Sequence, residues 1–519
     1  MGQFNGRRLS WLRLSVALVA IVALVATGFT GWHWFEDSKA AGEGKAWFAA
    51  YVDATTFPQL DFENPTTEAT RDVVLSFIVA SPGTPCAPSW GKDYTLDSAA
   101  ENLDLDRRIA RLRQNQGDVV VSFGGAINDE LAVVCTDEKQ LLKAYSAVVD
   151  RYDLRTIDLD LEGVGLTDTA ATDRRAAAIA KLQVERSALN KDLRVWLTLP
   201  VAPSGLTVEG VQAVTSMLNA GVDLSGVNVM TMDYGGSRTE DMSMLDASTA
   251  ALNATHRQLT NVYSAAGNPL GPATLWRRMG ATPMIGQNDV PGEVFGLDAA
   301  TELNKFATER GMGRLSMWSL NRDLTCGPNY PNPKIVSNSC SGVDQGSSTF
   351  AQALRGDLTD SPDKAAVTPN AVESETAGPV DDDPKNSPYP IWEEDVAYVE
   401  GTRIVWHRNV YVSKWWSTGD VPDDPTVDQF SSPWQLVGPV LPGEKPIPTP
   451  PLPAGTYPEW EAGTVYTTGE RVLMNGVGFT AKWWTQGQSP TARSTQTDPS
   501  PWERLSDVET RKVLADADR

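Results

Sequence analysis

Eight short apolar segments alternate with helix-like segments between residues 47 and 318, and this alternation constrains the fold more than any other feature. The strand candidates are 47–52, 73–79, 119–123, 156–162, 195–199, 227–232, 282–285 and 314–318. Segments between them space their apolar residues at helical intervals, as in 139–149, 172–188 and 208–218. The pattern predicts an α/β fold, a (β/α)8 barrel, whose active site lies at the carboxyl ends of the strands.

A doubly wound open sheet is the alternative fold for alternating strands and helices. That fold would place a glycine-rich phosphate-binding turn after the first strand. Residues 47–53 are followed by no such turn. The barrel is therefore the favoured prediction.

The fourth strand candidate carries three acidic residues on one face. Alternation along 156–162 places Asp158, Asp160 and Glu162 on one side of the strand and apolar residues on the other. Three carboxylates in a column repel one another and lose hydration when buried, so an ordinary strand does not collect them. The pattern predicts a carboxylate site at the strand end; a solvated strand face is the alternative interpretation.

The N-terminus has the pattern of an export segment. Arg7, Arg8 and Arg13 precede an uncharged stretch, 14–35, rich in Val, Ala, Leu and Ile. The stretch is long enough to span a bilayer, so residues 1–40 are interpreted as a signal peptide or a signal anchor. We expect the rest of the chain to be extracellular, either secreted or anchored to the outer face of the plasma membrane.

Four cysteines follow the export segment: Cys86, Cys135, Cys326 and Cys340. In an oxidising compartment an even count indicates two disulfides, for which three pairings exist. Pairing Cys86 with Cys135 and Cys326 with Cys340 is favoured, because each pair falls on neighbouring loops of the predicted barrel. The spacings match no zinc pattern and the chain has three histidines, so we expect no metal or other cofactor.

The composition changes after the barrel region, 44–345. Residues 346–388 are rich in Ser, Thr, Asp, Pro and Ala, which predicts a linker. Nine of the 17 tryptophans lie beyond it, so this tail is expected to be folded. The net charge of −22 disfavours nucleic acid and anionic lipid as partners and is compatible with a neutral polysaccharide.

The tail is an internal repeat. Trp392 recurs as Trp460 and Trp434 as Trp502, and residues between them recur in the same register, offset by 68 without a gap, with Tyr411 recurring as Phe479. We predict two small all-β modules, a proline-rich linker between them and a short C-terminal tail. The first module is 389–438, the linker 439–456, the second module 457–505 and the C-terminal tail 506–519.

The acidic strand resembles the signature of the chitinases of glycoside hydrolase family 18, D-x-x-D-x-D-x-E on the fourth barrel strand. Asp158, Asp160 and Glu162 fill its last three acidic positions, and Arg155 stands where the family usually has its first Asp. Three further segments resemble the family in order: Ser122-Phe-Gly-Gly125, Met230-Thr-Met-Asp-Tyr-Gly235 and Met317-Trp-Ser-Leu320.

The resemblance implies retaining hydrolysis of β-1,4 bonds between N-acetylglucosamine units, with the substrate's own acetamido group as nucleophile. Glu162 would be the general acid and then the base. Asp160 would orient the acetamido group, and Asp158 would share a proton with Asp160. The two lower carboxylates are expected to keep Glu162 protonated near neutral pH.

The resemblance also indicates side chains that would surround the sugar. Trp318 would form an apolar floor beneath it. Asp233 and Tyr234 would contact the acetamido group and the reacting sugar, with barrel packing as the alternative for Tyr234. Small residues at 122, 124 and 125 are expected to let the third strand pack closely beside the acidic column. The expected substrate-binding residues are Asp233, Tyr234, Met230, Trp318 and Tyr51.

The two tail modules resemble the chitin-binding modules of carbohydrate-binding families 5 and 12. The matching cores are Ser413-Lys-Trp-Trp-Ser417 and Ala481-Lys-Trp-Trp-Thr485. The resemblance implies that Trp415, Trp416, Trp483 and Trp484 contact the polymer. One of each adjacent pair is expected to face inward, because neighbours on a strand point in opposite directions.

These features together favour a monomeric endo-chitinase that binds chitin or chitin oligomers. The connection 286–313 is too short for the subdomain that deep-cleft relatives insert there, which predicts a shallow groove suited to internal cleavage. An endo-β-N-acetylglucosaminidase acting on N-glycans and a non-catalytic chitin-binding protein are the alternatives.

Overall fold

The computed structural model describes residues 46–328, 330, 335–362, 382–428, 430–447, 451–492, 500–505, 509–510 and 513–514. The expected export segment lies outside these residues. Among the residues that are described, no helix is both long and apolar enough to cross a membrane. Contacts divide the chain into two compact units. The first comprises residues 1–103 and 115–366, and the second comprises residues 104–114 and 367–519.

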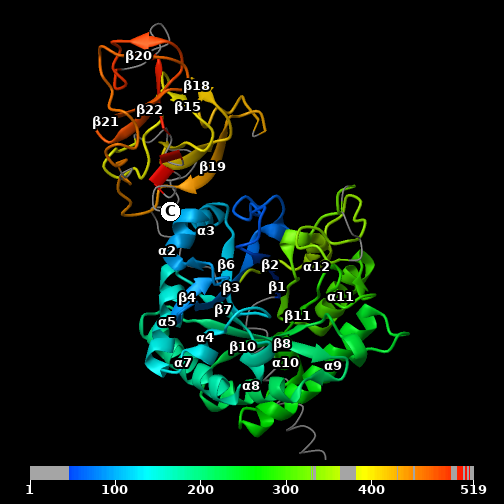
Figure 1. Ribbon diagram of the computed structural model, residues 1–519. Coiled ribbons are helices and arrows are strands. Elements are labelled where there is room, and N and C mark those ends of the chain that lie inside the picture. Colours follow the sequence, from blue (N-terminus) through cyan, green and yellow to red (C-terminus); the bar gives the residue numbers. More distant parts are fainter. Residues whose placement is uncertain are drawn as a thin grey trace, which may run out of the picture. The chain divides into compact units, whose positions relative to one another are not determined.

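The first unit contains a closed ring of parallel strands with helices on its outside (Figure 1). Two short strands, β1 (Trp47–Phe48) and β2 (Ala50–Asp53), together occupy the first position of the ring. β2 pairs with β3 and β1 pairs with β14, and these two pairings close the barrel. The remaining strands follow in chain order: β3 (Asp72–Ser81), β6 (Asp118–Gly124), β7 (Thr156–Asp160), β8 (Arg194–Ala202), β10 (Leu224–Met230), β11 (Met279–Thr282) and β14 (Arg314–Leu315). The predicted (β/α)8 barrel is confirmed.

The three helical stretches that periodicity predicts lie within α5, α7 and α8. Side-chain caps define where they begin: Asp137, Asp168 and Thr207 each accept a backbone N–H from the first turn. The helices of the first unit are α2 (Leu96–Asn102), α4 (Leu131–Val134), α5 (Glu138–Arg151), α6 (Gly163–Thr167), α7 (Thr169–Ala188), α8 (Val208–Asn219), α9 (Met244–Ala265), α10 (Pro272–Arg277), α11 (Leu297–Arg310) and α12 (Phe350–Arg355). Helix α3 (Leu105–Gln114) belongs to the second unit.

Smaller elements extend the barrel. Three-residue 3₁₀ helices form at η1 (Glu68–Thr70), η2 (Gly235–Ser237) and η3 (Leu320–Arg322). Antiparallel additions to the sheet are β4 (Thr84–Trp90), β5 (Tyr94–Thr95) and β9 (Gly205–Leu206). A separate hairpin, β12 (Gly286–Gln287) with β13 (Val294–Phe295), precedes α11, so a hairpin and one helix make up most of the connection 286–313.

The strand bounds differ from the predicted ones mainly at the carboxyl ends. The predicted strand 156–162 ends at Asp160, and 227–232 ends at Met230, because the residues that follow turn away to build the site. The predicted strand 282–285 is displaced: β11 ends at Thr282, directly before Pro283, which has no N–H for the sheet. The predicted linker also starts too early, because α12 buries Phe350 and Leu354.

Both favoured disulfide pairings are confirmed. Cys86 in β4 bonds to Cys135 just after α4, with Cα atoms 4.8 Å apart. Cys326 bonds to Cys340 in the segment that follows η3, with Cα atoms 5.0 Å apart. No described cysteine is free.

The second unit contains two β modules of the same strand pattern. The strands of the first are β15 (Ala397–Tyr398), β16 (Arg403–Trp406), β17 (Asn409–Ser413), β18 (Ser417–Thr418) and β19 (Trp434–Pro439). Those of the second are β20 (Val465–Tyr466), β21 (Arg471–Met474), β22 (Val477–Ala481), β23 (Thr485–Gln486) and β24 (Trp502–Arg504). Each module pairs two strands in one sheet and three in another. Repeated aromatic residues form each core, with Tyr398 against Trp434 and Tyr466 against Trp502.

Candidate active site

A cavity of about 330 Å³ lies at the carboxyl ends of the barrel strands. Six of the eight barrel residues that we predicted for the site line it: Tyr51, Asp160, Glu162, Met230, Asp233 and Trp318. Asp158 and Tyr234 do not line it. The cavity lies where a barrel enzyme binds its substrate.

Asp158 is fully buried beneath the cavity, where four donors from four strands hold its carboxylate. Arg314 donates to Oδ1 at 2.6 Å and Thr198 donates to the same oxygen at 2.7 Å. The hydroxyls of Tyr51 and Ser122 each donate to Oδ2 at 2.8 Å. Asp158 is therefore an ion-paired anchor of the barrel interior rather than a wall of the cavity.

Asp160 and Glu162 are the two acids of the column that face the cavity. Burial, together with the nearby charges of Glu162 and Asp158, raises the pKa of Asp160 well above its usual value. Among the described residues, its buried Oδ1 has no hydrogen-bond partner. Asp160 thus presents an acceptor that a ligand N–H could satisfy.

Glu162 has the pKa expected of a general acid that works near neutral pH. Burial raises its pKa to about 7, and the charge of Asp233 adds to this effect. We predicted that the two carboxylates below it would be the cause. The structure shows loss of hydration as the main cause and adds Asp233 from the neighbouring connection, while Glu162 and Asp160 also act on each other, because the Glu162 charge raises the pKa of Asp160.

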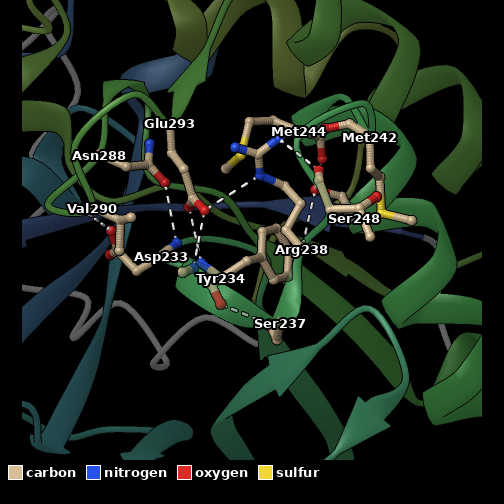
Figure 2. A network of polar contacts seen from close by, with 12 residues as sticks. Asp233, Tyr234, Ser237, Arg238, Met242, Met244, Ser248, Asn288, Val290 and Glu293 are labelled. Carbon is tan, nitrogen blue, oxygen red and sulfur yellow. Dashed lines mark hydrogen bonds and ion pairs between the residues drawn. The ribbon is translucent and has the colours of Figure 1, made fainter.

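Asp233 is held in place by the hairpin β12–β13 (Figure 2). Its backbone has a positive φ of 49°, and its Oδ1 accepts the backbone N–H of Val290 at 3.0 Å. The buried carboxylate of Glu293 accepts the backbone N–H groups of Tyr234 and Gly235 at 2.9 and 3.0 Å. The hairpin thereby fixes the turn that directs Asp233 into the cavity.

Tyr234, which we predicted to contact the sugar, does not line the cavity. Its side chain is buried, and its hydroxyl contacts the Ser248 hydroxyl in α9 at 3.3 Å. Asp233, directly before Tyr234, has a positive φ of 49° and does line the cavity. The alternative that we considered, barrel packing, describes Tyr234 correctly.

An aromatic wall faces the acids. Trp318 stacks on Phe77 with ring centroids 5.5 Å apart and an interplanar angle of 22°, and both rings line the cavity. Gly124 at the end of β6 and Gly125 directly after it allow close packing against Asp160 and Phe77. A Cβ at Gly124 would lie 2.0 Å from the carbonyl oxygen of Asp160, and one at Gly125 would lie 2.9 Å from the Phe77 ring.

Sequence reasoning missed several residues of the site. Two of them donate to Asp158, namely Arg314 and Thr198, and Glu293 accepts from the backbone after Asp233. Four others line the cavity: Phe77, Met232, Asp289 and Arg322. An arginine at the start of an apolar strand was the one signal that could have been noticed. The hairpin residues carry no such signal, because only folding brings them beside Asp233. No group of three or more described His, Cys, Asp or Glu side chains is arranged to hold a metal ion.

Both tryptophans of the adjacent pair in each module are exposed. This corrects the expectation that one tryptophan of each pair faces inward. Trp415 and Trp416 are 44% and 57% exposed, and Trp483 and Trp484 are 41% and 60% exposed. Each pair lies in a bend between two strands, so strand alternation does not apply. Lys414 covers one face of Trp415 and Lys482 one face of Trp483, at 4.6 and 4.8 Å from the ring centroids.

Comparisons with known proteins agree with this geometry. Residues 459–503 match the model of carbohydrate-binding module family 5/12. The chain is 36% identical over 297 residues to the probable bifunctional chitinase/lysozyme of Escherichia coli (strain K12), covering 55% of this chain and 32% of that relative. It is 35% identical over 293 residues to endochitinase 11 of Metarhizium anisopliae, covering 54% of each. The chain therefore spans about a third and about half of the length of these curated relatives.

A solved structure is also similar to the barrel part of the chain. The catalytic domain of a hyperthermophilic chitinase from Pyrococcus furiosus is 27% identical, with a TM-score of 0.50 over 60% of this chain and 93% of that domain. The predicted resemblance to chitinases is confirmed, as is that of the second module to the family 5/12 modules. The matched module model covers the second copy of the repeat.

Proposed function

We propose that this relative of the chitinases is itself an endo-acting chitinase, which hydrolyses β-1,4 bonds between N-acetylglucosamine units of chitin. The observation that carries the proposal is Glu162, an acid with a pKa of about 7, beside the buried acceptor Asp160 in a cavity walled by Trp318. A protonated acid, an amide acceptor and an apolar sugar platform are what hydrolysis assisted by the substrate's acetamido group requires.

In this mechanism the protein supplies no nucleophile. Glu162 gives its proton to the glycosidic oxygen as the bond to the anomeric carbon breaks, and the acetamido oxygen bonds to that carbon. Asp160 accepts the amide N–H and stabilises the positive charge of the cyclic intermediate. Water then attacks the anomeric carbon and returns a proton to Glu162.

We further propose internal cleavage of long chains. The short connection of the β12–β13 hairpin and α11 supports this, because it adds no separate wall beside the cavity. The activity on N-glycans and the non-catalytic reading have no feature of the site in their favour. Retention of the acid Glu162 argues against loss of catalysis.

Both tail modules are proposed to hold the enzyme on insoluble chitin. The family match supports this for the second module. The first shares its strand pattern and the exposed tryptophan pair, which supports the same role. Two binding modules on one chain would raise the apparent affinity through effective concentration. An extracellular location, secreted or membrane-anchored, is proposed from the sequence of residues 1–40 and is consistent with the two disulfides.

The direct test is hydrolysis of soluble chitin oligomers by the full chain and by Glu162→Gln. Turnover by the wild type that Glu162→Gln abolishes supports the proposal. No turnover by either, with binding to insoluble chitin retained, would favour the non-catalytic alternative. Long soluble chains that lose viscosity before dimers accumulate would support internal cleavage, whereas early release of dimers would contradict it.

A further inference from the structure

A buried ion pair lies in the helical layer outside the acidic strand. Arg175 in α7 is 0% exposed, and Glu130, the N-cap residue of α4, is 6% exposed. The Arg175 guanidinium donates to both carboxylate oxygens of Glu130, from Nη2 to Oε2 at 2.8 Å and from Nε to Oε1 at 3.3 Å. The Tyr145 hydroxyl in α5 donates to Oε1 at 3.1 Å. Three helical segments, of which α7 contacts the other two, therefore meet at one carboxylate (Figure 1).

Glu130 is held in place by several contacts of its own. Its Oε2 also accepts the backbone N–H of Val133 in the first turn of α4 at 3.2 Å. Cys135, the residue after α4, is joined to Cys86 in β4 by a disulfide. Glu130 also lies close to the end of β6, because a Cβ at Gly124 would lie 3.6 Å from its Cγ. The carboxylate is therefore a fixed partner for the arginine.

Arg175 connects this fixed carboxylate to the segment that follows β7. Its Nη2 also donates to the carbonyl oxygen of Gly165 at 2.9 Å. Gly165 belongs to α6, a helix of five residues whose N-cap residue is Glu162. The Glu162 carbonyl accepts the N–H of Leu166 at 3.2 Å, while the Glu162 side chain makes no capping bond. A helix this short is not stable by itself, so contacts from other segments set its position.

Stability is a weak reason for a buried ion pair at this place. The loss of hydration that two buried charges suffer offsets much of their attraction, and replacing such a pair with uncharged residues is often neutral or stabilising. What a buried pair specifies is one geometry of the groups around it. Here those groups include the Gly165 carbonyl, and through it the start of α6 at Glu162.

We propose that Arg175 is a positioning residue that, held by Glu130 and Tyr145, fixes α6 and thereby the direction in which Glu162 enters the cavity. The inference rests on the proposed chitinase activity, in which Glu162 gives its proton to the glycosidic oxygen. None of the three supporting side chains lines the cavity. Arg175 therefore acts on the rate of proton transfer and not on binding of the sugar.

A double variant separates positioning from stability. We compare thermal unfolding, and kcat and KM on soluble chitin oligomers, for the wild type, Arg175→Met, Glu130→Gln and the double variant. Each single variant should lower both the melting temperature and kcat. The double variant buries no unpaired charge, and its glutamine keeps an acceptor for Val133, so it should regain much of the lost thermal stability.

A positioning role and a purely structural role differ in the kcat of the double variant. Methionine gives no donor to the Gly165 carbonyl, so kcat should stay roughly 10²-fold below that of the wild type, as for a small misplacement of a catalytic group, while KM changes little. A stable double variant with the kcat of the wild type would overturn the inference, because the pair would then serve stability alone. A raised KM with an unchanged kcat would also overturn it.

Arg175→Lys keeps the inference testable if Arg175→Met does not fold. Lysine retains the charge beside Glu130, but its single nitrogen does not reproduce the fork that also reaches Gly165. The melting temperature should stay near that of the wild type while kcat falls. Arg257→Lys, an exposed substitution in α9, is the matched control and should change neither. An unchanged kcat in Arg175→Lys would contradict the inference.

Hydrogen exchange reads the position of α6 independently of turnover. Amide exchange in residues 163–168, measured by mass spectrometry, should be faster in Arg175→Lys than in the wild type, with exchange in α9 unchanged. Unchanged exchange in residues 163–168 would overturn the inference. A wild type that shows no turnover, together with faster exchange in α6 of the variant, would contradict the proposed function and leave the positioning of α6 standing.

Discussion

The carboxylate of Glu293 accepts the backbone N–H of Tyr234 at 2.9 Å, across 59 residues of sequence. This bond joins the β12–β13 hairpin to the turn after β10 (Figure 2). Because Asp233 lies one residue before Tyr234, the contact determines where the Asp233 carboxylate points. Asp233 in turn raises the pKa of Glu162. Glu293, which does not line the cavity, thus influences the pKa of Glu162 through the position of Asp233.

Replacing Glu293 with Gln should weaken this support. The NH2 group of the glutamine would face a backbone N–H of Tyr234 or Gly235, which needs an acceptor. We therefore expect the free energy of unfolding, measured by thermal unfolding, to fall by about 1–3 kcal/mol. The alkaline limb of the kcat/KM profile should move to lower pH, because Asp233 would act less strongly on Glu162. The control is Glu309→Gln, an exposed position near the end of α11. An unchanged pH profile in a destabilised Glu293→Gln protein would limit Glu293 to a structural role.

Glu162→Gln should abolish hydrolysis. Glutamine has the same shape but no acidic proton, and loss of general acid catalysis costs roughly 10²–10⁴-fold in rate. Turnover of soluble chitin oligomers is the measurement. Glu209→Gln, an exposed position in the first turn of α8, is the matched control and should keep wild-type activity. Equal activity of the two variants would show that Glu162 is not the acid.

The activity should fall as the pH rises through about 7. Glu162 acts when protonated, and its pKa is raised to about 7, so the alkaline limb of kcat/KM reports its ionisation. Asp233→Asn removes a negative charge that disfavours this ionisation. Its alkaline limb should therefore lie at lower pH than that of the wild type. Asp298→Asn, an exposed substitution in the first turn of α11, should leave the limb in place. A limb that Asp233→Asn moves to higher pH would contradict the electrostatic account.

The exposed and buried tryptophans of the first module should behave differently. Trp416→Ala removes a ring that is 57% exposed, so it should weaken chitin binding by about 0.5–1.5 kcal/mol and change stability little. Trp434→Ala removes a core ring that packs on Tyr398 and should destabilise the module by about 3–5 kcal/mol. Pull-down on insoluble chitin and thermal unfolding measure the two effects. If the double variant, Trp416→Ala with Trp484→Ala, binds chitin as well as the wild type, neither ring belongs to the binding surface.

Sugars that carry a carboxylate should be poor substrates. Besides the two acids of the column, the carboxylates of Asp53, Asp233 and Asp289 line the cavity, and like charges disfavour a further anion there. Arg322 is the one cation among the described residues that line it, and it donates to the carbonyls of Ser337 and Gln287. Release of reducing ends from a soluble glycan whose sugars carry free carboxylates should be much slower than from chitin oligomers. Comparable rates would show that the acidic wall does not select the substrate.

The sequence by itself determined the barrel, the acidic strand and the repeat, because each is a periodic or local pattern. Alternation along 156–162 was enough to place Asp160 and Glu162 on one face, and the barrel topology was enough to pair the four cysteines correctly. The repeat predicted two modules whose strands correspond one to one. These features depend on short-range spacing, which a sequence displays directly.

The tertiary structure alone decided how the acids differ from one another. Asp158 became an ion-paired anchor because β14 brings Arg314 to it, 156 residues away in sequence. Burial is the main cause of the raised pKa of Glu162, and Asp233 on another connection adds to it. The bends that expose both tryptophans of each pair likewise override strand alternation. Hydration and the distances between charges set these properties, and both exist only once distant segments are packed together.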